Sequence, residues 1–185
     1  AALLSEAARI HLSRVGDWER SGTLFALAIQ EGLDPESTPK GYADVVASRG
    51  DFGALRDLLL KRGQSLTGAA AIEAYQDAAI VERTHLKNEQ AAVEILAEAL
   101  AISDDWFSLR LMRELLYPAK DWERLVDVLQ RMAKLSEGAR AARCRVEEGR
   151  IFETEIGDLD AAATAYRKAL GAEPSFLDGF LAAVR

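Results

Sequence analysis

Apolar positions recur along this chain at helical spacing, and one combination of turn and helix returns at nearly regular intervals. The letters "DWER" occur twice, at positions 17–20 and 121–124, each time before an apolar helix-like stretch. Three further turns fall into the same register. The turn residues are Gly16, Gly50, Lys87, Lys120 and Gly157, spaced by 34, 37, 33 and 37 residues. A period of this length is typical of helical repeats.

The residues after each turn form matching columns. Eight residues on stand Leu24, Leu58, Ile95, Val128 and Ala165, and the next column holds Phe25, Leu59, Leu96, Leu129 and Tyr166. Twelve residues on stand Ala28, Arg62, Ala99, Met132 and Ala169. Apolar residues three and four apart share one face of an α-helix. Glycine suits the left-handed end of a helix, and the Asp or Asn beside it suits the start of the next. Each unit is therefore predicted to contain a helix, a tight turn and a second helix.

The first helix of each unit shows similar signals. In the fifth unit, one predicted face holds Ala142, Val146, Gly149, Phe152 and Ile156. Thr38-Pro39 reads as a helix start, and Ser103-Asp104-Asp105 offers N-caps for the helix that follows. Sustained alternation with period two is absent, so the sequence predicts an all-α fold. The units of 37 residues either lengthen the first helix or relax the turn.

These signals divide the chain into one array of units. We expect units at about 1–37, 38–67, 68–105, 106–138 and 139–174, with a partial sixth unit at 175–185. The sequence begins with Ala1 and ends in "FLDGFLAAVR", which reads as a helix cut short. We therefore expect a fragment of a longer, bacterial-style array.

The stretch from Glu147 to Pro174 resembles a tetratricopeptide repeat. The positions that match the family's pattern are Gly149, Phe152, Gly157, Ala162, Tyr166, Ala169 and Pro174, with one extra residue between the two glycines. The other units resemble it mainly through register. Lys87 and Lys120 replace the turn glycine in two of them, and Ser21 and Leu55 replace an alanine of the pattern in two others. The resemblance implies a right-handed α-solenoid of antiparallel helix pairs, in which the first helices line a concave groove. Such an array is stable because neighbouring units bury each other's apolar faces.

Composition narrows the class of partner. Hydrophobic residues make up 49% and charged residues 29% of the chain, which is typical of a soluble folded protein. The formal net charge of −7 argues against nucleic acid and anionic membranes as partners. The single Cys144 cannot form an internal disulfide, and no apolar run is long enough to span a bilayer. Cytoplasmic location is the expectation.

Catalytic motifs are not evident in the sequence. The two histidines, His11 and His85, lie far apart, and the ligand spacings of zinc sites do not occur. His85 comes just before a turn, where it can interact with a helix C-terminus. Ser37 and Lys40 match a hydrolase spacing, but a predicted helix start separates them. Phosphate-binding loops are also lacking. We expect no enzyme activity, no cofactor and no metal.

Basic residues mark the best candidate surface. On the first helix of the fifth unit, one edge holds Arg140, Arg143, Glu147, Arg150 and Thr154. On that of the fourth unit, the edge holds Arg110, Arg113 and Tyr117. If both edges face the groove, they form an arginine strip suited to carboxylate or phosphate groups of a partner. The alternative is a solvated face on which Arg143 pairs with Glu147 one turn away.

Aromatic residues fall into two classes. Trp18, Phe52 and Trp122 recur two residues after a turn, which indicates packing between helices. Trp106 occurs once, at the start of a first helix, and is a candidate groove residue because tryptophan is enriched at binding hot spots.

The sequence therefore predicts a protein–protein interaction scaffold that holds a peptide or helix of a partner. Two alternatives stay open: a structural array that dimerises through its ends, and a regulatory arm of an enzyme encoded outside this segment.

Overall fold

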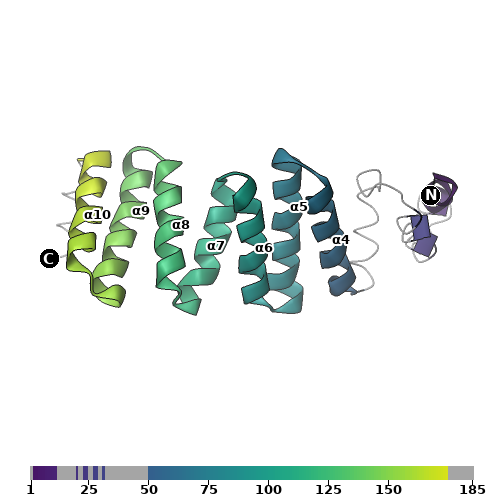
Figure 1. The fold of residues 1–185 in the computed structure, drawn as a ribbon, viewed down its shortest axis with the longest axis horizontal. Helices are drawn as coiled ribbons and strands as arrows, with labels where there is room; N and C mark the ends of the chain where they lie inside the picture. Colours follow the sequence, from purple (N-terminus) through teal and green to yellow (C-terminus); the bar gives the residue numbers. More distant parts are fainter. Residues whose placement is uncertain are drawn as a thin grey trace. The chain divides into compact units, whose positions relative to one another are not determined.

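A computed structural model describes residues 2–11, 20, 23–24, 27–28, 31 and 50–174. The chain divides into two compact units, residues 1–102 and 103–185, which hold several repeat units each and are called the first and the second unit below. All regular elements in the described residues are helices, and the fold is an all-α solenoid of helices packed in antiparallel pairs. Figure 1 shows the helices of each unit in chain order.

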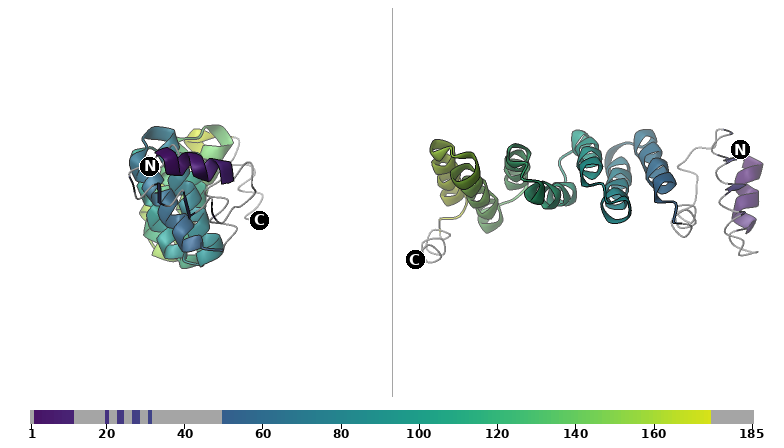
Figure 2. Two further views of the ribbon diagram at one scale, coloured as in Figure 1. Left: turned by 90° about the vertical axis from the view of Figure 1, so that its right-hand side faces the viewer. Right: turned by 90° about the horizontal axis from the view of Figure 1, so that it is seen from below.

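The first unit contains α1 (Ala2–Ile10), α4 (Phe52–Ser65), α5 (Gly68–Val81) and α6 (Glu89–Ile102). Helix α5 continues into a π-helical turn, η3 (Glu82–Leu86). It packs against α4 on one side and α6 on the other. Figure 2 shows these three helices from two further directions.

The second unit contains α7 (Trp106–Ala119), α8 (Trp122–Lys134), α9 (Gly138–Ile151) and α10 (Leu159–Ala172). Helix α9 likewise continues into a π-helical turn, η4 (Phe152–Ile156). Each helix packs against the next one along the chain.

The turns between helices follow the predicted register. Gly50, Lys87, Lys120 and Gly157 all adopt the left-handed conformation, with φ of 71°, 57°, 55° and 82°. After Lys120, the amide of Asp121 donates to the carbonyl of Leu116 at 3.2 Å, which closes the end of α7. Two lysines thus occupy a conformation that glycine adopts at less cost.

The residue after each turn caps the next helix as predicted. The side chain of Asp51 accepts from the amide of Ala54 at 3.0 Å, and that of Asp121 accepts from the amide of Arg124 at 3.2 Å. Asn88 and Asp158 make the equivalent bonds. Asp105 caps α7 by accepting from two amides. Each cap satisfies amides that the helix itself leaves unpaired.

The additional residues of the longer units lie in the first helix. The π-helical turns η3 and η4 each add five residues beyond α5 and α9. Helix α7 ends without such a turn. Of the two expectations for these units, the structure therefore shows a longer first helix. In both cases the next amide reaches back six residues, from Asn88 to Glu82 at 3.0 Å and from Asp158 to Phe152 at 2.9 Å.

The predicted apolar columns form the core. Leu96, Leu129, Ala99 and Met132 are buried, whereas Leu58 and Tyr166 are half-buried. The predicted buried face of the fifth repeat is confirmed at Ala142 and Gly149, which are buried. The prediction is wrong for Ile156, which is 43% exposed. Because η4 takes in an extra residue per turn, side chains at its end rotate away from the helical face.

The helices α4, α5 and α6 recur as α8, α9 and α10 after 70 residues. The start of α4 at Phe52 corresponds to the start of α8 at Trp122, and the left-handed Gly68 corresponds to the left-handed Gly138. The π-helical turns also correspond, at 82–86 and 152–156. Equivalent positions in the two sets can therefore be compared directly.

Several predictions concern residues outside the described ones. They are the turn at Gly16, the packing of Trp18, the helix start at Thr38-Pro39, the Ser37 and Lys40 pair, and the partial unit at 175–185. Of the other two turn aromatics, Phe52 stacks on His85 at 3.7 Å between ring centroids, and Trp122 meets Tyr117 edge-on at 5.7 Å.

Candidate functional site

The candidate surface is built on α7 and α9. These are the first helices of the fourth and fifth repeats, and both belong to residues 103–185. A bidentate ion pair joins their middles. Arg113 Nε donates to Glu147 Oε1 at 2.9 Å, and Arg113 Nη2 lies 2.9 Å from Glu147 Oε2. This planar two-point geometry is the strongest arrangement of guanidinium and carboxylate. The same hydrogen bond raises the pKa of Arg113 above its usual value.

A second contact joins the beginnings of the same two helices. The guanidinium of Arg140 on α9 lies 5.1 Å from the ring centroid of Trp106 on α7, a cation–π distance. Both cross-helix pairs are separated by 34 residues, so α7 and α9 run parallel in constant register. Seven residues along each helix separate the two contacts, which is about 10.5 Å of helix.

Arg110 and Arg143 belong to the stretch between these two contacts. Both are exposed, and each lies within one turn of both contacts along its own helix. Arg110 approaches the ring of Phe107 at 5.4 Å and the carboxylate of Glu114 at 4.0 Å. Two guanidinium groups therefore come from opposite helices onto one short stretch of surface. We call this stretch, with Arg113, Glu147 and the exposed Arg150 one turn further along α9, the arginine strip.

Two further candidate residues lie beyond the ion pair. Arg150 is exposed on the last turn of α9, and Tyr117 is 56% exposed on the last turn of α7. Trp106 at the other end is half-buried beneath Arg140. The structure thus joins α7 to α9 at two of the six candidate residues, Trp106 and Arg113, and leaves the other four at or near the surface.

One expected pairing on this surface differs in the structure. The alternative interpretation paired Glu147 with Arg143 within α9, whereas the structure pairs it with Arg113 on α7. Local spacing indicates only the pairing within α9, because Arg113 reaches Glu147 through the register of the two helices. As a consequence, the guanidinium of Arg143 is not used to neutralise Glu147.

Sequence reasoning did not identify a buried polar cluster on the other side of α9. Glu148 is 2% exposed and accepts from Gln130 Nε2 on α8 at 2.7 Å and from Arg145 Nη1 at 2.8 Å. The sequence did contain a signal for this cluster, because polar residues occupy positions that are apolar in the corresponding earlier helices. Seventy residues earlier, the positions of Gln130, Arg145 and Glu148 hold Leu60, Tyr75 and Ala78.

Other chemistry finds little support in the described residues. Burial raises the pKa of the Cys144 thiol, so this thiol is not activated as a nucleophile. No group of three or more potential metal ligands occurs within the part of the chain that the structure describes. Among the described helices, none combines the length and apolar character needed to cross a bilayer.

Comparison with known proteins supports the fold. No protein-family model matches the chain, and no curated protein sequence matches it. Among solved structures, the crystal structure of MamA matches with a TM-score of 0.50 and 16% sequence identity. The match covers 85% of this chain and 89% of that one. At this level of identity the likeness shows the fold alone, which is a tetratricopeptide-like all-α solenoid.

Proposed function

We propose that this protein is an interaction scaffold whose arginine strip binds anionic side chains of a partner peptide. The observation that carries this proposal is the ion pair between Arg113 and Glu147. It aligns two helix edges, so that Arg110 and Arg143 serve one surface. Guanidinium groups suit carboxylate and phosphate because they donate two parallel hydrogen bonds.

The net charge of the whole chain limits which anionic partners can bind. With a formal net charge of −7, the protein as a whole repels anionic partners. A local basic strip therefore selects for a partner that brings its anionic groups to this place. Exposed aromatic surface at Phe107 and Tyr117, 37% and 56% exposed, offers apolar contact beside the charges. A binding role of this kind requires no catalytic group and no cofactor.

An array of synthetic peptides tests the proposal. The peptides carry carboxylate or phosphate groups in varied spacing, and matched peptides carry amides in place of the acids. We expect the protein to bind a subset of the anionic peptides, and to lose that binding when Arg110, Arg143 and Arg150 are replaced by glutamate. Arg113 is left in place so that the two helix edges stay aligned.

A matched control makes the same charge change elsewhere. Lys61, Lys134 and Arg167 are exposed on α4, α8 and α10, and their replacement by glutamate alters net charge equally. Circular dichroism confirms that both triple variants remain helical. Equal loss of binding in both variants would show that global charge matters and would overturn the assignment to the strip. Unchanged binding in the first variant would overturn it as well.

A further inference from the structure

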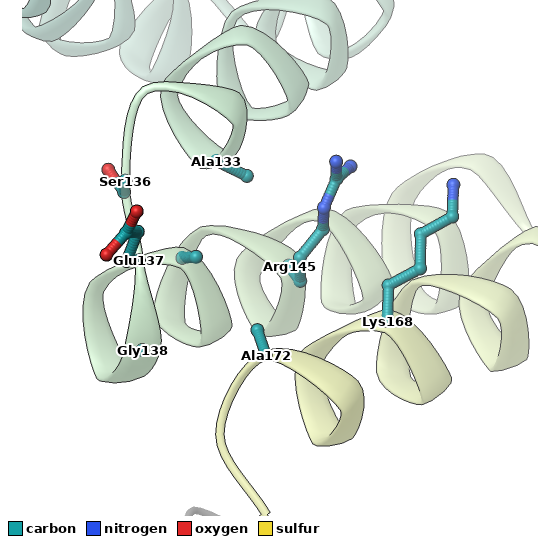
Figure 3. A pocket seen from close by; sticks show the side chains of 8 residues that line it. Ala133, Ser136, Glu137, Gly138, Arg145, Lys168 and Ala172 are labelled. Atoms are coloured by element: carbon teal, nitrogen blue, oxygen red, sulfur yellow. The ribbon is translucent and has the colours of Figure 1, made fainter.

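A hollow of about 460 Å³ lies where the end of α8, the start of α9 and the end of α10 meet (Figure 3). This place is distinct from the arginine strip and involves none of its residues. Its lining includes small residues: Ala133, Gly138, Ala141 and Ala172. The polar residues of the lining are Ser136, Glu137, Arg145 and Lys168. A volume of this size suits a small ligand or a single large side chain.

The equivalent place in the first unit contains an aromatic ring. Arg145 corresponds to Tyr75 and Ala133 to Gly63, because a shift of 70 residues brings α5 onto α9 and the start of α4 onto the start of α8. The ring of Tyr75 packs against Gly63, where an added Cβ would lie 3.0 Å from three ring atoms. Tyr75 is only 8% exposed. The pair of α4 and α5 therefore accommodates a planar ring at a position whose counterparts in the second unit, Ala133 and Arg145, line the hollow.

An arginine in a polar cluster replaces the tyrosine in the second unit. Arg145 is held by Glu148, which is itself fixed by Gln130, and both Arg145 and Ala133 line the hollow. Burying such an ion pair is costly, and apolar residues at equivalent positions commonly do as well or better. The first unit uses Leu60, Tyr75 and Ala78 there. The fold itself therefore does not require the polar cluster.

The charged side chains of the hollow are unevenly distributed along it. Lys168 is exposed and stands where the first unit has Glu98. Figure 3 shows the side chains of Arg145 and Lys168 extending in the same direction, away from Glu137 at the other end. The ammonium of Lys168 and the guanidinium of Arg145, which also pairs with Glu148, stand at one end of a floor of small apolar residues. This arrangement matches an anionic group attached to a flat apolar one.

We propose that this hollow is a binding site for an aromatic ring that carries a carboxylate. The ring lies over Ala133 and Ala141, as the ring of Tyr75 lies over Gly63, and the carboxylate meets Lys168 and Arg145. Two sources share this chemistry: a free aromatic acid and the C-terminal aromatic residue of a peptide.

Titration of the full chain with 3-phenylpropionate, followed by two-dimensional NMR of backbone amides, tests the site. We expect saturable shifts in amides around Ala133, Gly138 and Ala172. Propionate, which lacks the ring, and 3-phenylpropanamide, which lacks the charge, should each bind at least about tenfold more weakly. A short peptide that ends in phenylalanine, with a free or an amidated terminus, identifies the source. Tighter binding of the free-terminus peptide than of the free acid assigns the site to a chain end, and the reverse order assigns it to a small acid.

The chain supplies its own control variants. The double variant Ala133→Gly with Arg145→Tyr is made in a background that also carries Gln130→Leu and Glu148→Ala, so that no buried carboxylate loses its partner. This set transplants the arrangement of the first unit, so the protein should fold and lose binding because a ring fills the hollow. Lys168→Glu should weaken binding about tenfold, whereas Arg167→Glu, with the same charge change beside it, should not. Binding that survives in the double variant, or that falls equally in the two single variants, would overturn the proposal. So would the absence of saturable shifts with both the acid and the free-terminus peptide.

Discussion

The ring of Tyr166 on α10 lies directly over the backbone of Gly149 on α9. A Cβ at Gly149 would lie 2.5 Å from Tyr166 Cε1, closer than any real contact of this kind. The phenol of Tyr166 donates to Glu153 Oε2 in η4 at 2.6 Å, which holds the ring in place. The close approach of the last helix pair therefore depends on glycine at this one position.

Replacing Gly149 with alanine should destabilise the protein by about 1–3 kcal/mol, because the added methyl group overpacks a fixed ring. Gly171 is the matched control, since it lies in α10 with no atom within 4 Å of its added Cβ. Gly171→Ala should instead stabilise by about 0.4–1 kcal/mol by restricting the unfolded chain. Urea denaturation measures both. Equal stability of the two variants would show that the ring is free to move aside.

The hydroxyl of Tyr166 should ionise well above the usual range for tyrosine. Desolvation and the hydrogen bond to Glu153 raise its pKa to about 12. Because this folded-state pKa is above the unfolded value, the stabilisation is complete below about pH 10 and is lost as pH rises toward 12. Ultraviolet titration of phenolate, compared with Tyr166→Phe, assigns the phenol that ionises near pH 12. A titration that the substitution leaves unchanged above pH 11 would contradict the assignment.

The pair of Arg113 and Glu147 should show energetic coupling across helices. Because both side chains are partly exposed, a double-mutant cycle to alanine is expected to give about 0.5–1 kcal/mol, decreasing with added salt. Arg110 and Glu114, at 4.0 Å within α7, serve as the comparison and should give about 0.3 kcal/mol. A coupling of zero for the first pair would mean that it does not align α7 and α9.

Lys120→Gly should stabilise the second unit. Lys120 has φ of 55°, a conformation that costs a side-chain-bearing residue about 1–2 kcal/mol. After the greater entropy of glycine in the unfolded chain is subtracted, a net gain of about 0.5–1 kcal/mol remains. Lys61→Gly, inside α4, should instead cost about 1 kcal/mol. Thermal and urea unfolding of the two variants distinguish these effects, and a loss of stability in Lys120→Gly would contradict the conformational argument.

Acid should weaken the cap of α8. The Arg124 guanidinium, whose Nε donates to Asp121 Oδ2 at 2.6 Å, lowers the pKa of Asp121 below its usual value of 3.8. The stabilisation is therefore present above that value and is lost as pH falls through the lower folded-state pKa. Asp121→Asn keeps a capping side chain but removes this titration. Denaturation across the acid range should show a smaller pH dependence for Asp121→Asn, and an identical dependence would exclude Asp121 as a contributor.

Much of the fold was predictable because the signals are local. Gly157 and Asp158 mark a turn and a cap by their own backbone preferences, and the register then identified Lys120 and Asp121 without a glycine. The prediction failed at Ile156 because η4 shifts the helical phase, and nothing in the apolar spacing indicated that shift. On the candidate surface, the sequence identified the two edges of basic residues but could not choose a partner for Glu147.

The sequence by itself determined the all-α fold, the positions of the turns and caps, and the faces that form the core. These properties depend on residues within a few positions of one another, so spacing and side-chain type are sufficient to predict them. Only the tertiary structure decided that Arg113 pairs with Glu147, that Gly149 accepts the ring of Tyr166, and that Arg145 pairs with Glu148 beside an open hollow. Each of these depends on how one helix is placed against another, and that placement is set by packing between residues far apart in the chain.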